Sequence, residues 1–175
     1  MKKSISLLLL SLLMIAPSCQ KTKEAANEYN IVPKPNQIIP REGRFELSNK
    51  VRLVVPPDAP EVKDIADSLA GRLKLTAGIT LKEADSADCK QAICFVMEKG
   101  MPKEGYKLSV TSNLITVTAS QPNGFFYGVQ TLFQLLPTAI YGKQLDKKAD
   151  WSVPAVEIED APRFEWRGFM LDASR

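Results

Sequence analysis

The sequence contains no histidine among its 175 residues. This absence excludes schemes in which an imidazole of this chain acts as general base, including Ser-His-Asp triads, and it excludes the H-E-x-x-H zinc site. A glycine-rich phosphate loop is also missing, because Gly124 and Gly128 lack the neighbours that a Walker or dinucleotide-binding pattern requires. We therefore expect neither a nucleotide site nor any other cofactor.

Cysteine is scarce, with three residues, and does not replace the missing ligands. Cys89 and Cys94 lie five positions apart (94 minus 89), and two thiols without other soft ligands do not complete a zinc site, so no metal is expected. In an extended segment five residues separate two Cα atoms by roughly 16 Å, beyond the roughly 7 Å limit for a disulfide. A buried strand position explains Cys94 and a loop explains Cys89, although a turn between them would permit a bond in an oxidising compartment.

No excess of positive charge is available for nucleic acid. Lys and Arg number 23 against 20 Asp and Glu, and no stretch after Tyr29 gathers basic residues among aromatic stacking partners. The hydrophobic fraction of 45% and the charged fraction of 25% are ordinary for a globular protein. At 175 residues the chain has room for one domain with appendages, but not for a complete (β/α)8 barrel of about 250 residues.

The N-terminus has the layout of a secretory signal. Residues 1–18 combine two lysines with an apolar run that breaks at Pro17, short of the roughly 20 residues that a membrane-spanning helix needs. With Cys19 directly after it, the segment resembles a bacterial lipoprotein signal, in which that cysteine is acylated, although Pro17 departs from the usual small residue. Residues 19–28 are polar and predict a tether off a membrane surface. We expect a lipid-anchored protein of the bacterial cell envelope, on the outer membrane or its periplasmic face; a secreted protein is the alternative.

Hydrophobic patterning over residues 29–160 predicts an α+β domain, with a mainly antiparallel sheet and two helices on one face. The first helix is expected from an Asp58 N-cap, with Pro60 in its first turn, to a Gly78 C-cap. The second covers 123–136, where Gly124 and Gly128 leave a strip without side chains that suits close packing on a sheet. Residues 31–35 form a stiff lead-in, and Gly43 marks a turn. Strands are expected at 45–47, 51–55, 79–81, 92–97, 106–110, 114–119 and 151–159, the pair around 111–113 forming a hairpin, while 138–150 is a polar connection.

The closing stretch predicts a different kind of strand. Gly168 to Leu171 is an apolar run flanked by charge, typical of a strand buried on both faces in a parallel sheet or barrel. Asp172 and Arg175 follow where such a strand presents its carboxyl end, which carries the chemistry in barrel enzymes. Without neighbours this strand would have unpaired edges and be prone to aggregation unless it folds back on the domain.

Three stretches together resemble the β-N-acetylhexosaminidases of glycoside hydrolase family 20. They are Ile-Val-Pro-Lys-Pro at 31–35, Glu-Gly-Tyr at 104–106 with Gly-Phe-Phe-Tyr-Gly-Val-Gln-Thr-Leu at 124–132, and Ala-Pro-Arg-Phe-Glu-Trp-Arg-Gly-Phe-Met-Leu-Asp-Ala-Ser-Arg at 161–175. The resemblance implies a zincin-like domain without zinc at 29–160, followed at 161–175 by the start of a truncated (β/α)8 barrel.

The resemblance also implies an activity, the removal of terminal N-acetylhexosamine residues from glycans by a substrate-assisted retaining mechanism. A glutamate protonates the leaving oxygen while the acetamido group of the substrate attacks, steered by an aspartate; these carboxylates belong to later barrel strands. Arg175 matches an arginine that binds sugar hydroxyls, for which its planar fork is suited. Asp172 would order Arg175 or, as we favour, pair inside the barrel, and Arg167 has a structural role at the barrel floor.

No catalytic residue is therefore expected in this chain, and the chain as written is expected to lack glycosidase activity. The alternative is a non-catalytic surface lipoprotein module that binds a glycan or a protein partner. Reading the gene beyond Arg175 separates the two: continuation into a histidine and, later, an Asp-Glu pair favours the enzyme, and a stop codon favours the module.

Overall fold

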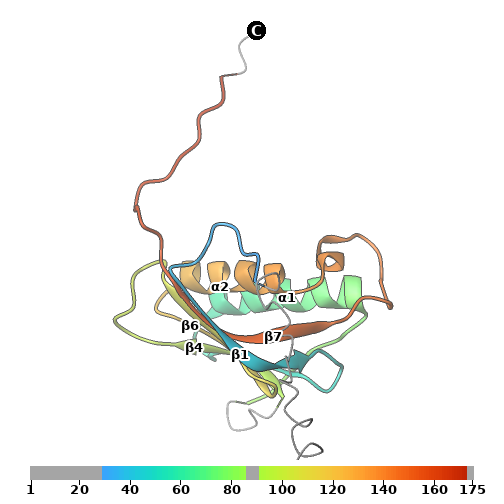
Figure 1. The fold of residues 1–175 in the computed structure, drawn as a ribbon. Coiled ribbons are helices and arrows are strands. Elements are labelled where there is room, and N and C mark those ends of the chain that lie inside the picture. Colours follow the sequence, from blue (N-terminus) through green and yellow to red (C-terminus); the bar gives the residue numbers. More distant parts are fainter. Residues whose placement is uncertain (1–28, 86–90, 173–175) are drawn as a thin grey trace, which may run out of the picture.

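The computed structural model describes residues 29–85 and 91–172, and it has a seven-stranded sheet with both α-helices on one face (Figure 1). This arrangement confirms the predicted α+β class. The predictions for the signal, the tether, Cys19, Cys89 and Arg175 fall outside the described residues. Among the described residues, no helix is long and apolar enough to cross a membrane.

The sheet is mixed, in the order β1-β7-β5-β6-β4-β2-β3. Its strands are β1 (Gln37–Glu46), β2 (Arg52–Val54), β3 (Lys82–Glu83), β4 (Ala92–Met97), β5 (Tyr106–Val110), β6 (Leu114–Ala119) and β7 (Ser152–Asp160). The expected antiparallel pairing holds for β1 with β7, β7 with β5, and β5 with β6, the last pair forming the predicted hairpin. The other three pairs, β6 with β4, β4 with β2, and β2 with β3, are parallel. The parallel pairing of β2 with β3 and β4 follows from α1, which provides the crossover connection that a parallel neighbour needs. Strands β4 and β6 are parallel because β5, between them in the sequence, pairs on the far side of β6.

Helix α1 (Pro60–Ala77) packs on the sheet through residues at helical spacing: Val62, Ala66, Leu69 and Leu73. It ends as predicted at Gly78, whose φ of 69° lies in the left-handed region and whose N–H donates to the Leu73 carbonyl. The predicted Asp58 N-cap is wrong, since the cap is Ala59 without a side-chain hydrogen bond. The reason is Pro60 in the first turn, which forces the preceding residue out of the helical region.

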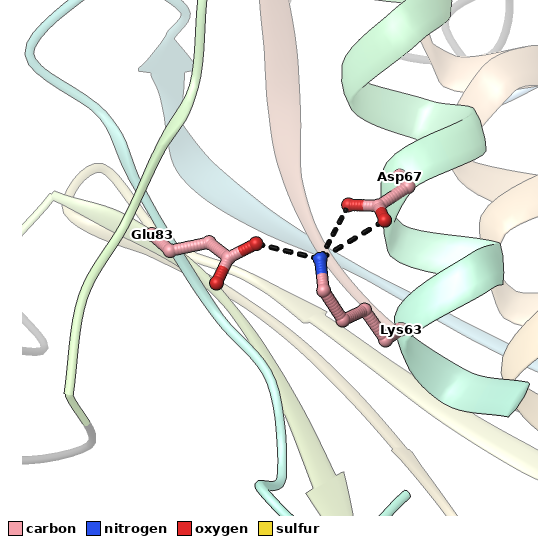
Figure 2. A network of polar contacts seen from close by, with 3 residues as sticks. All are labelled: Lys63, Asp67 and Glu83. Carbon is pink, nitrogen blue, oxygen red and sulfur yellow. Dashed lines mark hydrogen bonds and ion pairs between the residues drawn. The ribbon is translucent and has the colours of Figure 1, made fainter. Parts of the chain in front are cut away.

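The strand predicted at 79–81 is wrong and is replaced by β3. Ile79 instead completes the end of α1, where it is buried and its N–H donates to the Leu73 carbonyl at 3.3 Å. Figure 2 shows how β3 is then tied to the helix: Lys63 Nζ lies 2.6 Å from Glu83 and 2.9 Å from Asp67. The hydrogen bonds to Glu83 and then Asp67 raise the pKa of Lys63 to about 12. These groups are exposed, so the network orients β3 more than it stabilises the domain.

The N-terminal strand is longer than expected. The prediction of a turn at Gly43 before 45–47 is wrong, because one strand, β1, runs from Gln37 to Glu46 and pairs with β7 on both sides of an irregularity between Pro40 and Arg44. Gly43, with a φ of 103°, lies within that irregularity and not in a chain reversal. Local turn signals cannot distinguish a bulge from a hairpin, because both use a left-handed glycine.

The core lies between the sheet and the helices. Helix α2 (Pro122–Leu135) confirms the second predicted helix, and its fully buried Phe125 stacks obliquely on Phe95 of β4 with ring centroids 5.8 Å apart. After α2 a 3-10 turn (Thr138–Tyr141) buries Ile140 where only a polar connection was expected. Cys94 is buried in β4, as predicted; whether it bonds to Cys89 stays a prediction.

Residues 161–172, which we call the closing segment, leave the domain after β7 and run away from it (Figure 1). No strand is present over residues 161–172, so the predicted barrel strand is unconfirmed. Phe169, Met170 and Leu171 are 88%, 93% and 75% exposed. The segment therefore does not fold back to cover its apolar side chains.

Candidate functional site at the domain seam

A pocket of about 560 Å³ lies where the lead-in, α2 and the closing segment meet. We call it the seam pocket. Its lining includes Val32 and Lys34 from the lead-in, Tyr127 and Gln134 from α2, and Arg167 from the closing segment. The three stretches that carry the family resemblance, which lie far apart in the sequence, thus converge on one site.

Hydrogen bonds fasten the lead-in to both other walls. The Gln134 side chain accepts the Val32 N–H at 2.8 Å and donates to the Val32 carbonyl at 3.1 Å. Asn36 donates its backbone N–H to Asp160 Oδ1 and its side-chain amide to the Ala161 carbonyl, both at 3.0 Å. The beginning and the end of the domain are therefore held together at the seam.

The two glycines of α2 determine how closely this helix approaches the sheet. A Cβ on Gly124 would overlap the carbonyl oxygen of Gly105, and one on Gly128 would lie 2.6 Å from Val117 Cγ1. The strip without side chains is thus in contact with β6 and with the turn before β5, as the sequence predicted. This close approach places Tyr127, between the two glycines, beside Glu104 of the same turn.

A buried pair of hydroxyl groups, from Tyr106 and Thr131, lines the seam pocket. The Tyr106 hydroxyl and Thr131 Oγ1 lie 2.6 Å apart, with Tyr106 only 3% exposed. Burial raises the pKa of Tyr106 to about 12, while the hydrogen bond with Thr131 acts in the opposite direction.

Arg167 brings the closing segment onto the pocket rim. Its Nη2 donates to Glu104 Oε2 at 2.7 Å and to the Tyr127 hydroxyl at 3.4 Å, and its Nη1 donates to the Phe164 carbonyl at 2.6 Å. The hydrogen bonds to Glu104 and then Tyr127 raise the pKa of Arg167 above its ordinary value. The two carboxylates of the pocket thus have partners, Glu104 in Arg167 and Asp160 in Asn36. Over residues 29–85 and 91–172, no group of three or more His, Cys, Asp or Glu could hold a metal ion.

Comparison of the sequence with known protein families gives a match that covers the domain around the seam pocket. The family model of glycosyl hydrolase family 20, domain 2, matches residues 28–161. The chain belongs to this family.

Relatives of the family 20 domain are hexosaminidases. The chain is 35% identical to a β-hexosaminidase of Porphyromonas gingivalis over 172 residues, which cover 94% of this chain and 22% of that protein. It is 29% identical over 154 residues to the N,N'-diacetylchitobiase of Vibrio harveyi, covering 83% of this chain and 15% of the relative. The chain thus spans between 15% and 22% of the length of these two relatives.

Solved family 20 structures share the fold. The β-N-acetylhexosaminidase of Streptomyces coelicolor A3(2) superposes with a TM-score of 0.72 at 30% identity, over 80% of this chain and 28% of that one. The N-acetyl-β-hexosaminidase of Streptomyces plicatus gives the same TM-score at 29% identity, over 81% of this chain and 28% of that one.

Within the family 20 domain, the structure brings together some predicted residues and leaves others apart. Asp172 is exposed at the end of the described closing segment, away from the seam pocket, and its pairing role stays a prediction, as does the sugar contact of Arg175. Sequence reasoning placed Arg167 at a barrel floor but missed its partners Glu104 and Tyr127. Both belong to stretches that carry the resemblance, yet nothing local shows that residues 63 positions apart form an ion pair.

The buried Tyr106 predicts a specific pH dependence. Its folded pKa of about 12 lies above the unfolded value of about 10, so its contribution to stability is complete below about pH 10 and is lost as the pH rises towards 12. We expect the free energy of unfolding, measured with urea, to fall across this window less steeply in Tyr106→Phe than in the wild type. Equal slopes would contradict the assignment.

Proposed function

We propose that this chain is the N-terminal part of a β-N-acetylhexosaminidase that removes terminal N-acetylhexosamine residues from glycans, and that the described domain braces a catalytic (β/α)8 barrel. One observation carries the proposal: nearly the whole chain aligns with a hexosaminidase but accounts for only 22% of it. In such relatives most of the length lies outside the matched part. Further support comes from the solved structure of a mutant β-hexosaminidase of Streptomyces plicatus, 30% identical to this chain, in complex with the product GlcNAc.

The seam pocket suits a bracing role better than a catalytic one. A glycosidase acid or nucleophile needs a carboxyl group that can reach the substrate, whereas Glu104 is bonded to Arg167 and Asp160 to Asn36. The exposed apolar side chains of the closing segment, Trp166, Phe169 and Met170, are a surface that the barrel would cover.

The chemistry itself is assigned to the barrel. There a glutamate would protonate the leaving oxygen while the acetamido group of the substrate attacks the anomeric carbon, steered by an aspartate. From this chain we assign one contact to the sugar, between Arg175 and its hydroxyls, with Asp172 as a neighbouring ordering or pairing group.

We also propose that the protein is anchored to the bacterial cell envelope through an acylated Cys19, with residues 19–28 as tether. The basis is the signal layout of residues 1–18. Mass spectrometry of the mature N-terminus decides this point, since an unmodified Cys19 amine or cleavage elsewhere would remove the anchor.

The activity is tested with an aryl N-acetylglucosaminide that releases a chromophore. The purified 175-residue chain is expected to release none, and the same chain continued into its barrel is expected to be active. Release by the 175-residue chain itself would refute the assignment of the chemistry to the barrel, and an inactive longer protein would refute the enzyme.

A further inference from the structure

We infer that Glu104 and Tyr127 form a socket for the Arg167 guanidinium that fixes the rotation of the chain entering the barrel. The inference rests on the proposed function, because the orientation of residues 168–172 matters only where a barrel strand follows. Arg167 is thereby a positioning residue, acting on sugar binding through the strand that it orients.

The geometry of the socket restrains rotation as well as position. Three acceptors surround one planar guanidinium: Glu104 at 2.7 Å, the Phe164 carbonyl at 2.6 Å and the Tyr127 hydroxyl at 3.4 Å. Nη2 is held by the two domain groups, Glu104 and Tyr127, while Nη1 bonds to the Phe164 carbonyl of the closing segment itself. The planar group thus ties the backbone of the closing segment to the domain, which a lysine ammonium without a planar fork would do less rigidly. The Glu104 side chain is only 23% exposed, so the ion pair is partly shielded from water.

The socket is part of the domain and not of the closing segment. Glu104 precedes Gly105, whose N–H closes a turn onto the Pro102 carbonyl at 2.9 Å. Contact of Gly124 with that turn locks it against α2. Tyr127 lies on α2 with its ring packed edge-on against Phe126, the centroids 5.6 Å apart. Arg167 therefore docks onto elements that the core already holds.

Docking at Arg167 has a consequence for the residues beyond it. Successive side chains of a strand point to opposite sides, and a shift by one residue exchanges the two sets. Once the strand predicted at Gly168–Leu171 forms, Phe169 and Leu171 lie on the side of Arg167, and Met170 on the other. The socket thus selects which set faces the domain and which faces away.

The first test concerns the socket alone and needs no barrel. Trypsin must extract the Arg167 side chain from its hydrogen bonds to cleave after it. Arg163 also lines the seam pocket, but its side chain makes no hydrogen bond or ion pair within the described residues, so it serves as an internal reference. In the 175-residue chain, Glu104→Gln and Tyr127→Phe are expected to raise the initial rate of cleavage after Arg167 relative to that after Arg163, Glu104→Gln by about two- to fivefold. The control is Glu98→Gln, which removes the more exposed ion pair with Lys107, away from the seam pocket, and should leave the ratio unchanged.

The second test measures positioning in the longer hexosaminidase. Glu104→Gln is expected to raise KM by about three- to tenfold and to leave kcat within about twofold, because the socket acts on sugar binding and not on the carboxylates of later strands. The charge swap Glu104→Arg with Arg167→Glu should recover part of the loss, which a purely structural defect would not.

The outcomes separate the inference from the proposed function. An unchanged trypsin ratio overturns the socket. A changed ratio with unchanged KM overturns its positioning role. If the wild-type longer protein shows no hexosaminidase activity, the proposed function fails and the positioning role fails with it, while the trypsin result still reports whether the socket exists.

Discussion

Replacing Gly124 by alanine is expected to lower the free energy of unfolding by about 3 kcal/mol, at the upper end for overpacking of a well-packed site. The added methyl would overlap the Gly105 carbonyl oxygen and lie 2.8 Å from Ala119 Cβ. Neither atom belongs to a flexible side-chain end, so α2 or the turn at 102–105 has to move. Urea unfolding followed by circular dichroism measures the change.

The matched control is Gly71→Ala, in the middle of α1. A Cβ at Gly71 meets no atom within 4 Å, so this variant gains helix propensity without a clash and is expected to be more stable by about 0.8–1 kcal/mol. The two substitutions add the same methyl group to two helices and are predicted to act in opposite directions. A stable Gly124→Ala protein would show that the close approach of α2 is not required.

The same displacement should also be visible at the seam. Because Gly124 holds the turn that carries Glu104 against the helix that carries Tyr127, moving them apart breaks the socket for Arg167. Gly124 thus couples the packing of α2 inside the domain to the direction in which the chain leaves the domain at Arg167.

Features governed by local physics could be predicted from the sequence. The helical spacing of Val62, Ala66, Leu69 and Leu73 and the left-handed Gly78 defined α1 almost to its ends, and the glycine strip of α2 faces the sheet as expected. Short-range alternation similarly located β5, β6 and β7, and a continuous apolar run located β4, to within a residue or so.

Features that depend on distant partners could not be predicted. The sequence around Ile79 was compatible with a strand or with the end of α1. In the folded domain Ile79 is buried and bonded to the end of the helix. The parallel half of the sheet depends on where the crossover through α1 and the strand β5 return the chain. The pairing of Arg167 with Glu104 joins two segments that only the folded domain brings together. Each stretch of the seam carried a family signal, but their convergence is a property of the fold.

The largest effect on catalysis is expected at Arg175. Its substitution by alanine in the longer hexosaminidase should lower kcat/KM by about 100-fold, because charge-assisted hydrogen bonds to the sugar contribute ~1.5–3 kcal/mol and their loss leaves hydroxyls without partners. Arg175→Lys keeps the charge but not the planar fork, so it should recover only part of the loss. Steady-state kinetics with an aryl N-acetylglucosaminide measure both variants.

Arg72→Ala is the control for removing an arginine, since Arg72 lies on α1 and its guanidinium makes one long hydrogen bond, 3.4 Å to the Gly142 carbonyl, in the described part of the chain. It should leave kcat/KM within about twofold. If Arg175→Ala keeps wild-type kcat/KM while unfolding at the same urea concentration, then Arg175 does not touch the sugar. The orientation set by the Arg167 socket would in that case have no binding residue to act through, and Glu104→Gln should lose its effect on KM as well.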